Sequence, residues 1–252
     1  MRNLPDGLVI EPVSEIDHGV LRSGKEAQIN LVEWLDADGR SSLVARKFYL
    51  PREVKQKGQL EALGVQRSST FRNDVEYREG RQFRKTRDRR AVERMTTYGK
   101  RLLQSRWTSH EHDVMDELWR SGAPVPYPIR YADDVFHLEY VGDETMAAPQ
   151  LAGARLAGDD LDSAWEQVVE GLHAVAGAGY AHGDLSAYNL LWWEGRVWFI
   201  DFPQAVDLAQ NPQGVEFLHR DVVNVTTWFV RRGLDLDAEE VFAELLGSVY
   251  GS

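Results

Sequence analysis

One stretch in the C-terminal half combines side chains that could carry out chemistry with apolar runs that could hold them in place. Asp184 and Asn189 fall in a predicted loop, and Asp201 follows further along the chain. Between them, Leu190–Trp193 and Arg196–Ile200 predict two short strands around a Glu-Gly turn. Such a hairpin would bring Asn189 and Asp201 to the same end of a short ladder, close enough to share one cation.

The spacing His-x-Asp-x-x-x-x-Asn, which begins at His182, is typical of a phosphotransferase site. Asp184 could accept the proton of the attacking nucleophile, and Asn189 and Asp201 could bind a metal ion. Magnesium needs hard oxygen ligands and usually takes only one or two from the protein, with phosphates and water supplying the others. The alternative is a surface loop with capping Asp and Asn residues beside an ordinary hairpin.

The composition indicates a globular chain and excludes several classes of site. The sequence has 252 residues, of which 43% are apolar and 27% are charged. It has no cysteine, which excludes disulfides, thiolate metal sites and a cysteine nucleophile. No apolar run is long enough for a membrane span, and the N-terminus lacks the apolar core of a signal peptide, so we expect a cytoplasmic enzyme.

The charge is unevenly distributed along the chain. The net charge is −11, which argues against general affinity for nucleic acid. Residues 78–106, however, hold eleven Lys or Arg against three acidic residues. This basic segment could contact RNA phosphates, or it could be a solvated, charged stretch.

The N-terminal part predicts an antiparallel sheet. Residues 19–35 predict two strands around a turn that contains Ser23-Gly24-Lys25-Glu26-Ala27, and a glycine-bearing turn of this kind can place backbone N–H groups over phosphates. Residues 42–49 predict a third strand, in which Lys47 points to the same side as Leu43 and Ala45. Taken alone, the turn could also be an exposed hairpin and Lys47 a solvated side chain.

The remainder alternates between irregular and helical segments. Residues 50–90 are hydrophilic and without clean periodicity, which predicts a mobile or functional insert. Helical periodicity follows, and the predicted helices and strands are helix 91–120 with a break near 105–109, strands 129–132 and 135–140, and helices 160–179, 214–232 and 237–249.

Several separated pieces of the chain together resemble one family, the RIO kinases, which are atypical protein kinases with a trimmed kinase fold. The similarity is greatest to their Rio-one branch and spans roughly residues 14–235. The matching pieces are Ser23-Gly24-Lys25-Glu26-Ala27, Ala45-Arg46-Lys47, Glu111 ahead of residues 122–126, residues 77–84, Leu138-Glu139-Tyr140-Val141-Gly142, residues 182–189, Ile200-Asp201 and residues 217–225.

The resemblance implies an α+β fold with two lobes in a single kinase domain over 1–252. Residues 1–140 would form an N-lobe of antiparallel sheet plus helix, with the insert at about 50–90. Residues 141–252 would form a mainly helical C-lobe. The chain after Asp201 is short and has no Ala-Pro-Glu, so we expect neither the activation segment nor the peptide-docking helices.

The resemblance also implies roles for individual residues. Lys47 would hold the α- and β-phosphates of ATP and be oriented by Glu111. The turn at Ser23, Gly24, Lys25, Glu26 and Ala27 would cover the phosphates. Backbone groups of Glu139 and Val141 would bind adenine. Asn189 and Asp201 would hold Mg²⁺, with Mn²⁺ as a substitute, and Asp184 would orient or deprotonate the nucleophile.

Two departures from the usual kinase pattern bear on mechanism. Asp201-Phe202-Pro203 replaces Asp-Phe-Gly, and proline fixes φ where glycine leaves it free, which argues against a flip of this segment. Ser186 stands where many kinases place a lysine that touches the transferred phosphate.

Four functions therefore compete. The first is a serine/threonine kinase that acts on an unknown protein or on itself. The second is an ATPase switch in a ribosomal or RNA-associated assembly, in which Asp201 is transiently phosphorylated. The third is a small-molecule kinase of the aminoglycoside or sugar type, and the fourth is a binding scaffold, which the intact catalytic positions argue against.

Overall fold

The computed structural model describes residues 3–24, 27–49, 97–132 and 135–250. Its N-terminal part is a five-stranded antiparallel sheet with the strand order β1-β2-β3-β5-β4. The strands are β1 (Ser14–Ser23), β2 (Ala27–Leu35), β3 (Ser41–Tyr49), β4 (Pro128–Ala132) and β5 (Val135–Glu139). The α+β arrangement expected from the sequence is confirmed.

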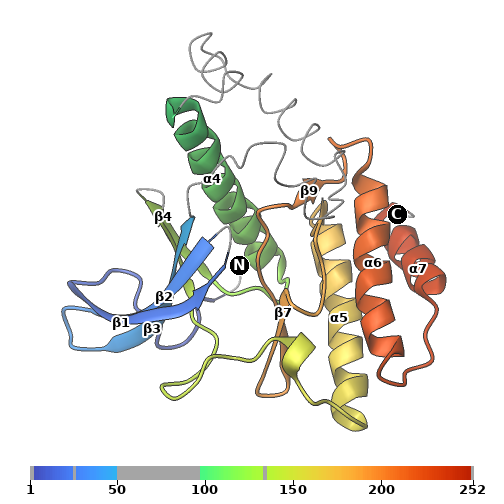
Figure 1. Cartoon of the computed structure of the whole chain (residues 1–252), viewed down its shortest axis with the longest axis horizontal. Helices are drawn as coiled ribbons and strands as arrows, with labels where there is room; N and C mark the ends of the chain where they lie inside the picture. Colours follow the sequence, from blue (N-terminus) through green and yellow to red (C-terminus); the bar gives the residue numbers. More distant parts are fainter. Residues whose placement is uncertain (1–2, 25–26, 50–96, 133–134, 251–252) are drawn as a thin grey trace, which may run out of the picture.

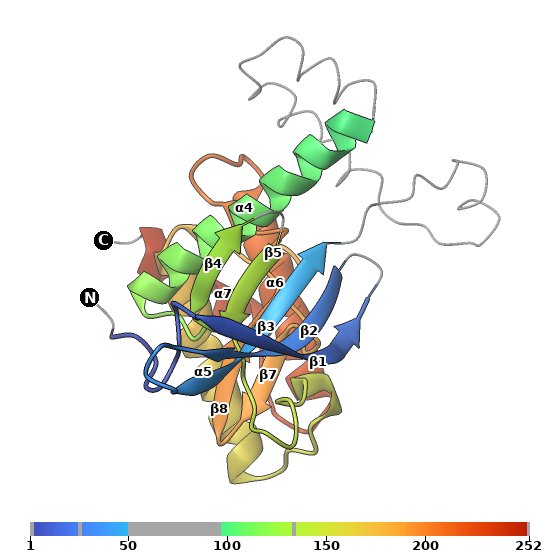
Figure 2. The same ribbon diagram turned by 90° about the vertical axis from the view of Figure 1, so that its left-hand side faces the viewer.

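A single long helix, α4 (Thr97–Ser121), packs beside β4 and β5 (Figure 2). The break predicted near 105–109 was wrong, because the helix continues without interruption through this stretch. Between Gly99 and Gly122 the sequence contains neither proline nor glycine, the two residues that most strongly disrupt a helix. The predicted beginning of the helix, at residues 91–96, lies outside the described residues, as does the insert at 50–90.

The C-terminal part is mainly helical. The helices α5 (Asp159–Gly177), α6 (Gly214–Val230) and α7 (Ala238–Tyr250) stand side by side, away from the sheet (Figure 1). The hairpin β7 (Leu190–Trp193) and β8 (Arg196–Phe199) pairs as predicted. The short 3-10 helix η1 (Leu151–Gly153) and the two-residue strands β6 (Tyr180–Ala181) and β9 (Val206–Asp207) were not predicted from the sequence.

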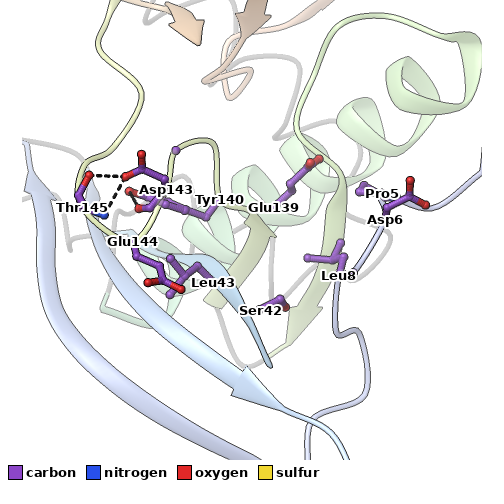
Figure 3. Close-up of a pocket in the computed structure, with 12 residues that line it drawn as sticks. Pro5, Asp6, Leu8, Ser42, Leu43, Glu139, Tyr140, Asp143, Glu144 and Thr145 are labelled. Carbon is purple, nitrogen blue, oxygen red and sulfur yellow. Dashed lines mark hydrogen bonds between the residues drawn. The ribbon is translucent and has the colours of Figure 1, made fainter. Parts of the chain in front are cut away.

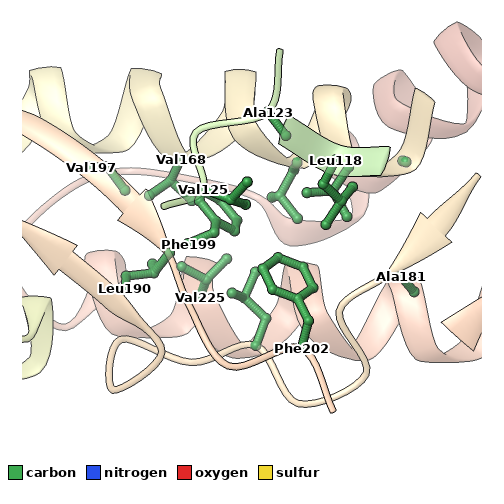
Figure 4. Packing of buried hydrophobic residues seen from close by; sticks show 14 of the residues in the cluster. Leu118, Ala123, Val125, Val168, Ala181, Leu190, Val197, Phe199, Phe202 and Val225 are labelled. Carbon is green, nitrogen blue, oxygen red and sulfur yellow. The ribbon is translucent and has the colours of Figure 1, made fainter. Parts of the chain in front are cut away.

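One hydrophobic cluster joins the two parts of the chain. It includes Leu118 of α4, Phe136 of β5, Val168 of α5, Phe199 of β8 and Val225 of α6, all of which are buried. Figure 4 shows the side chains of α4, β7, β8 and α6 converging in this core. The core contains residues from before and after residue 140, so it does not divide the chain there. The lobe boundary after residue 140 stays a prediction.

A smaller cluster covers the opposite face of the sheet. Val9, from the segment before β1, packs with Val32, Trp34 and Val44, and its backbone amide donates to Ser42 Oγ at 2.9 Å. The N-terminal segment therefore closes the outer face of the sheet and leaves the inner face, which carries Lys47, toward the rest of the chain. No helix in the described part of the chain has the length and apolar character that a membrane crossing requires.

Candidate active site

The centre of the site is an ion-pair network around Lys47. Its Nζ donates to Glu111 Oε1 at 2.8 Å, to Glu111 Oε2 at 3.0 Å and to Asp201 Oδ1 at 2.7 Å. The side chains of Lys47 and Glu111 are almost fully buried, whereas that of Asp201 is 47% exposed. Three elements supply these groups: β3, α4 and the segment after β8.

Local structure explains why Lys47 reaches this network. In β3, residues at alternate positions share one face, and the antiparallel register places Lys47 opposite Ile29 of β2 and Phe136 of β5. Helix α4 lies beside β4 and β5, so Glu111 on its buried side meets Lys47. The expectation that Glu111 orients Lys47 agrees with this contact.

The charges of the network shift the pKa values of its members. Burial alone would lower the pKa of Lys47, but the Asp201 and Glu111 carboxylates outweigh it and raise that pKa above the usual value. The positive charge of Lys47 lowers the pKa of Asp201, while burial raises the pKa of Glu111. The positive charge of Arg22, in β1, also contributes to lowering the pKa of Asp201.

The segment after β8 is held in one arrangement. Asp201 has a positive φ of 71°, a conformation that a non-glycine residue adopts at some cost. The amide of the next residue, Phe202, donates to Glu111 Oε1 at 3.1 Å, and the Phe202 ring is buried against His182, with ring centroids 4.4 Å apart. The contacts of Phe202 thus anchor the residue that follows Asp201, while Asp201 itself binds Lys47.

The hairpin brings Asn189 and Asp201 to the same end, as predicted. Ile200 donates its amide to the carbonyl of Asn189 at 3.0 Å, which extends the pairing of the hairpin to its end and brings Asn189 beside the residue that precedes Asp201. Asn189 Nδ2 donates to the carbonyl of Asp184 at 2.9 Å, and the carboxamide oxygen is therefore the atom that could serve a cation. The Asp184 residue is exposed to solvent. Its pKa is nevertheless raised, because the surrounding protein removes part of its hydration and Asp201 adds negative charge, while His182 opposes the shift.

The donor set at this end of the hairpin fits Mg²⁺. One carboxylate (Asp201) and one carboxamide (Asn189) are hard oxygen ligands, and two protein ligands are what a nucleotide-bound Mg²⁺ usually takes. Within the described residues, no group of three or more His, Cys, Asp or Glu side chains could hold a metal ion. Such a cation would therefore depend on phosphate oxygens for its other ligands.

Asp221, for which the sequence suggested no individual role, lies beneath the loop of residues 182–189. This carboxylate is fully buried in α6 and accepts the amide of Gly183 at 2.8 Å and that of Leu185 at 2.9 Å. The signal was present in the sequence, because Asp221 interrupts an apolar stripe formed by Leu218, Val222 and Val225. A carboxylate at such a position needs buried donors, and the loop supplies them.

Comparisons with known proteins identify the family. A family model described as the RIO domain matches residues 57–241. The chain belongs to this family.

Relatives named as RIO kinases align with large parts of this RIO domain. RIO-type serine/threonine-protein kinase Rio1 from Thermoplasma acidophilum is 32% identical over 135 residues, which are 54% of this chain and 69% of the relative. A probable serine/threonine-protein kinase RIO1 homolog from Encephalitozoon cuniculi is 28% identical over 92% of this chain. Relatives named Rio1 agree with the predicted Rio-one branch.

The chain spans only part of several relatives. It covers 58% of the Encephalitozoon protein and 31% of bovine serine/threonine-protein kinase RIO3, to which it is 29% identical. Among solved structures, the Rio2 kinase from Chaetomium thermophilum matches with a TM-score of 0.56 at 20% identity, covering 94% of this chain and 68% of that one. Its complex described as ADP/Mg²⁺-phosphoaspartate matches with a TM-score of 0.55 at 18% identity. These two likenesses support the fold.

The expected phosphate turn is described only in part. Gly24 donates its amide to the carbonyl of Ala27 at 2.9 Å, which closes the turn between β1 and β2, and Ser23 is the last residue of β1. Lys25 and Glu26 lie outside the described residues. The position of this turn over the phosphates stays a prediction.

The expected hinge of the RIO domain borders a cavity of about 560 Å³ (Figure 3). The Glu139 amide donates to Tyr127, while the carbonyl of Val141 accepts the amide of Ala148; both distances are 2.9 Å. The cavity is lined by the N-terminal segment, the start of β3, Glu139, Tyr140 and residues 142–145, whereas Val141, Lys47 and Asp201 do not line it. Backbone recognition of adenine by Glu139 and Val141 stays a prediction.

Proposed function

We propose that this RIO domain is a protein kinase that transfers the γ-phosphate of ATP to serine or threonine hydroxyls, including its own. The observation that carries the proposal is the buried contact of Lys47 with both Glu111 and Asp201, at the end of the hairpin that also bears Asn189. In a member of the RIO domain family, this arrangement is suited to holding a nucleotide with its metal ion.

Each side chain would contribute positioning and charge, because phosphoryl transfer demands little covalent chemistry from the protein. Lys47 holds the α- and β-phosphates while Glu111 keeps its ammonium group in place. Asn189 and Asp201 hold Mg²⁺, which when bound neutralises charge on the phosphates. Mn²⁺ is a substitute with the same preference for oxygen ligands.

Asp184 orients the attacking hydroxyl and accepts its proton. Its exposed carboxylate stands between two anchored residues, and Asn189 holds its carbonyl. Ser186 offers no positive charge at the place where many kinases have a lysine. Charge on the transferred phosphate is therefore left to the metal ion and the phosphate turn.

The test is phosphate transfer from labelled ATP by the purified chain in the presence of Mg²⁺. We expect labelled serine or threonine, and we expect Asp184→Ala to lower turnover by about 10² to 10⁴ while nucleotide binding persists. Asp38→Ala, in an exposed turn, is the matched control. Wild-type turnover in Asp184→Ala would contradict the assignment of the base.

A specific observation favours the ATPase switch as the second candidate. Asp201 is 47% exposed and lies beside Lys47, so its carboxylate is accessible to a phosphoryl group. The Rio2 kinase structure from Chaetomium thermophilum is described as containing phosphoaspartate. The two candidates separate by chemistry, because an acyl phosphate on Asp201 is labile to acid and hydroxylamine whereas phosphoserine and phosphothreonine withstand acid.

Contact with RNA or a ribosomal particle through residues 78–106 is a separate proposal. Residues 78–96 lie outside the described part of the chain, and for 97–106 only the helical backbone is described. The support is the local excess of positive charge. RNA binding that weakens with salt and is lost when this segment is neutralised would support the contact, and absent or salt-independent binding would contradict it. We place the activity in the cytoplasm, where ATP is available.

A further inference from the structure

Two side chains of α6 hold the carbonyl groups on either side of Asp184. Arg220 Nη2 donates to the carbonyl of Gly183 at 2.6 Å, and Asn224 Nδ2 donates to the carbonyl of Leu185 at 3.3 Å. Residues 220 and 224 are one helical turn apart and so lie on the same face of α6. Side chains of α6 therefore supply hydrogen-bond donors to the peptide carbonyls on both sides of Asp184.

Asp221 completes this contact from the amide side. Because it accepts the amides of Gly183 and Leu185, every polar backbone group of these two residues has a partner on α6. Arg220 and Asp221 thus grip the residue before Asp184 through its carbonyl and its amide.

The backbone at Gly183 has little space in which to shift. Its φ is +82°, and a Cβ at this residue would lie 2.2 Å from the carbonyl oxygen of Gln204. The loop is thus pressed between α6 and the segment after Asp201. A shift of the Gly183 peptide would move Asp184 relative to Asp201.

The Arg220 side chain packs against a neighbouring ring of α6 and brings a positive charge close to the loop. Its guanidinium lies over the Phe217 ring, 4.8 Å from the centroid. Burial raises the pKa values of Asp184 and Asp221, and the positive charge of Arg220 opposes this effect at both carboxyl groups. The contact with Gly183 is thus charge-assisted and stronger than a neutral one.

We propose that Arg220 is a positioning residue of the phosphotransfer reaction. It fixes the Gly183 carbonyl and thereby keeps the Asp184 carboxylate oriented toward the nucleophile. The proposal rests on the proposed function. Arg220 acts through the loop and does not touch the reacting atoms.

The test compares kinetic constants of Arg220→Met, which removes the donors and the charge but keeps side-chain length. We expect kcat to fall by about 10- to 100-fold, since a small misplacement of a catalytic group can cost that much, while KM for ATP changes by less than about twofold. Arg220→Lys keeps a charged donor and should recover most of the loss. Arg231→Met, an exposed arginine at the end of the same helix, is the matched control.

A double variant tests whether Arg220 acts through Asp184. If it does, Arg220→Met should slow the Asp184→Ala protein no further, because residues that act as a unit are not additive. An equal fold loss in both backgrounds would overturn the proposal, as would a raised KM with unchanged kcat.

Amide exchange gives a readout that needs no activity. Exchange at Gly183 and Leu185, followed by NMR, should be at least about tenfold faster in Arg220→Met than in the wild type, and unchanged exchange would overturn the proposal. Arg220→Gln, which keeps neutral donors, serves if the Met variant does not fold. A wild-type protein without ATP turnover would contradict the proposed function, whereas the exchange result would still decide whether Arg220 fixes the loop at Gly183.

Discussion

At the scale of single residues, the chemistry depends on one buried cation between two carboxylates. Lys47 and Glu111 are separated by 64 residues in sequence, yet both are almost fully removed from water and paired. Taking such charges out of water is costly, and only the pairing offsets this cost. The ion pair that we propose to hold the nucleotide therefore also affects the stability of the folded chain.

Lys47→Met should lower both nucleotide binding and stability. It leaves Glu111 as a buried acid without its cation, and we expect the free energy of unfolding at pH 7 to fall by about 3–5 kcal/mol. Denaturant unfolding measures this loss.

The double variant Lys47→Met with Glu111→Leu is the control for this prediction. Replacing both charged partners by apolar side chains leaves no buried charge, so stability should return close to that of the wild type. ATP binding should stay impaired. A single Lys47→Met variant as stable as the wild type would contradict the ion-pair argument.

His137 provides a prediction on pH. Burial, helped by Arg130, lowers the pKa of this side chain to about 4, and its Nδ1 is buried without a hydrogen-bond partner. The unfolded chain, with an ordinary histidine pKa, binds more protons between pH 6.5 and 4 than the folded chain does. Stability should therefore be full above pH 6.5 and fall by up to about 3 kcal/mol as the pH drops toward 4.

His137→Gln separates this effect from the titration of carboxylates. Urea unfolding at a series of pH values should give a smaller decrease for the variant than for the wild type between pH 6.5 and 4. Parallel pH dependences of the two proteins would show that His137 is not responsible.

At the scale of elements, the packing of α5 against β8 fixes the hairpin that carries Asn189 and Asp201, the proposed metal ligands. A Cβ at Gly171 of α5 would lie 2.4 Å from the Phe199 ring of β8. Because Phe199 comes just before Ile200 and Asp201, a shift of this strand would reach the site.

Gly171→Ala should therefore destabilise the protein by about 1–3 kcal/mol and lower turnover. Gly177→Ala is the matched control, because Gly177 ends the same helix and nothing lies within 4 Å of its added Cβ. We expect this control to be neutral, or more stable by up to about 1 kcal/mol. Thermal unfolding of the two variants tests the packing, and equal effects would contradict it.

At the scale of the whole molecule, the site exists only when the sheet and the helical part are assembled. Lys47 comes from the sheet, Glu111 from α4, and Asn189 and Asp201 from the hairpin, and the shared core joins these parts. A ligand that bridges them should stabilise the folded chain as a unit.

ADP with Mg²⁺ at 100 times its Kd should raise the free energy of unfolding by about 2.7 kcal/mol. Asn189→Leu should reduce the part of this gain that depends on Mg²⁺, since it removes one ligand, and leave the gain from ADP alone. Thermal shifts with ADP, with and without Mg²⁺, measure both. Equal Mg²⁺ dependence in the variant would exclude Asn189 as a metal ligand.

The sequence by itself determined the local part of this protein. Alternation in β2 and β3, helical periodicity in α5, α6 and α7, and the motif from His182 to Asn189 each depend on neighbours in the chain, and they predicted elements and candidate residues. Lys47, Asn189 and Asp201 were identified in this way, and so was the hairpin between the last two. Glu111 was identified from the resemblance to the RIO kinases.

Only the tertiary structure decided which distant groups meet. Lys47 binds Glu111 and also Asp201, which is 154 residues further along the chain. Arg220 and Asp221 bind the backbone of a loop almost forty residues before them. No pattern within a single segment records such partners, because they arise when the buried faces of several elements pack together.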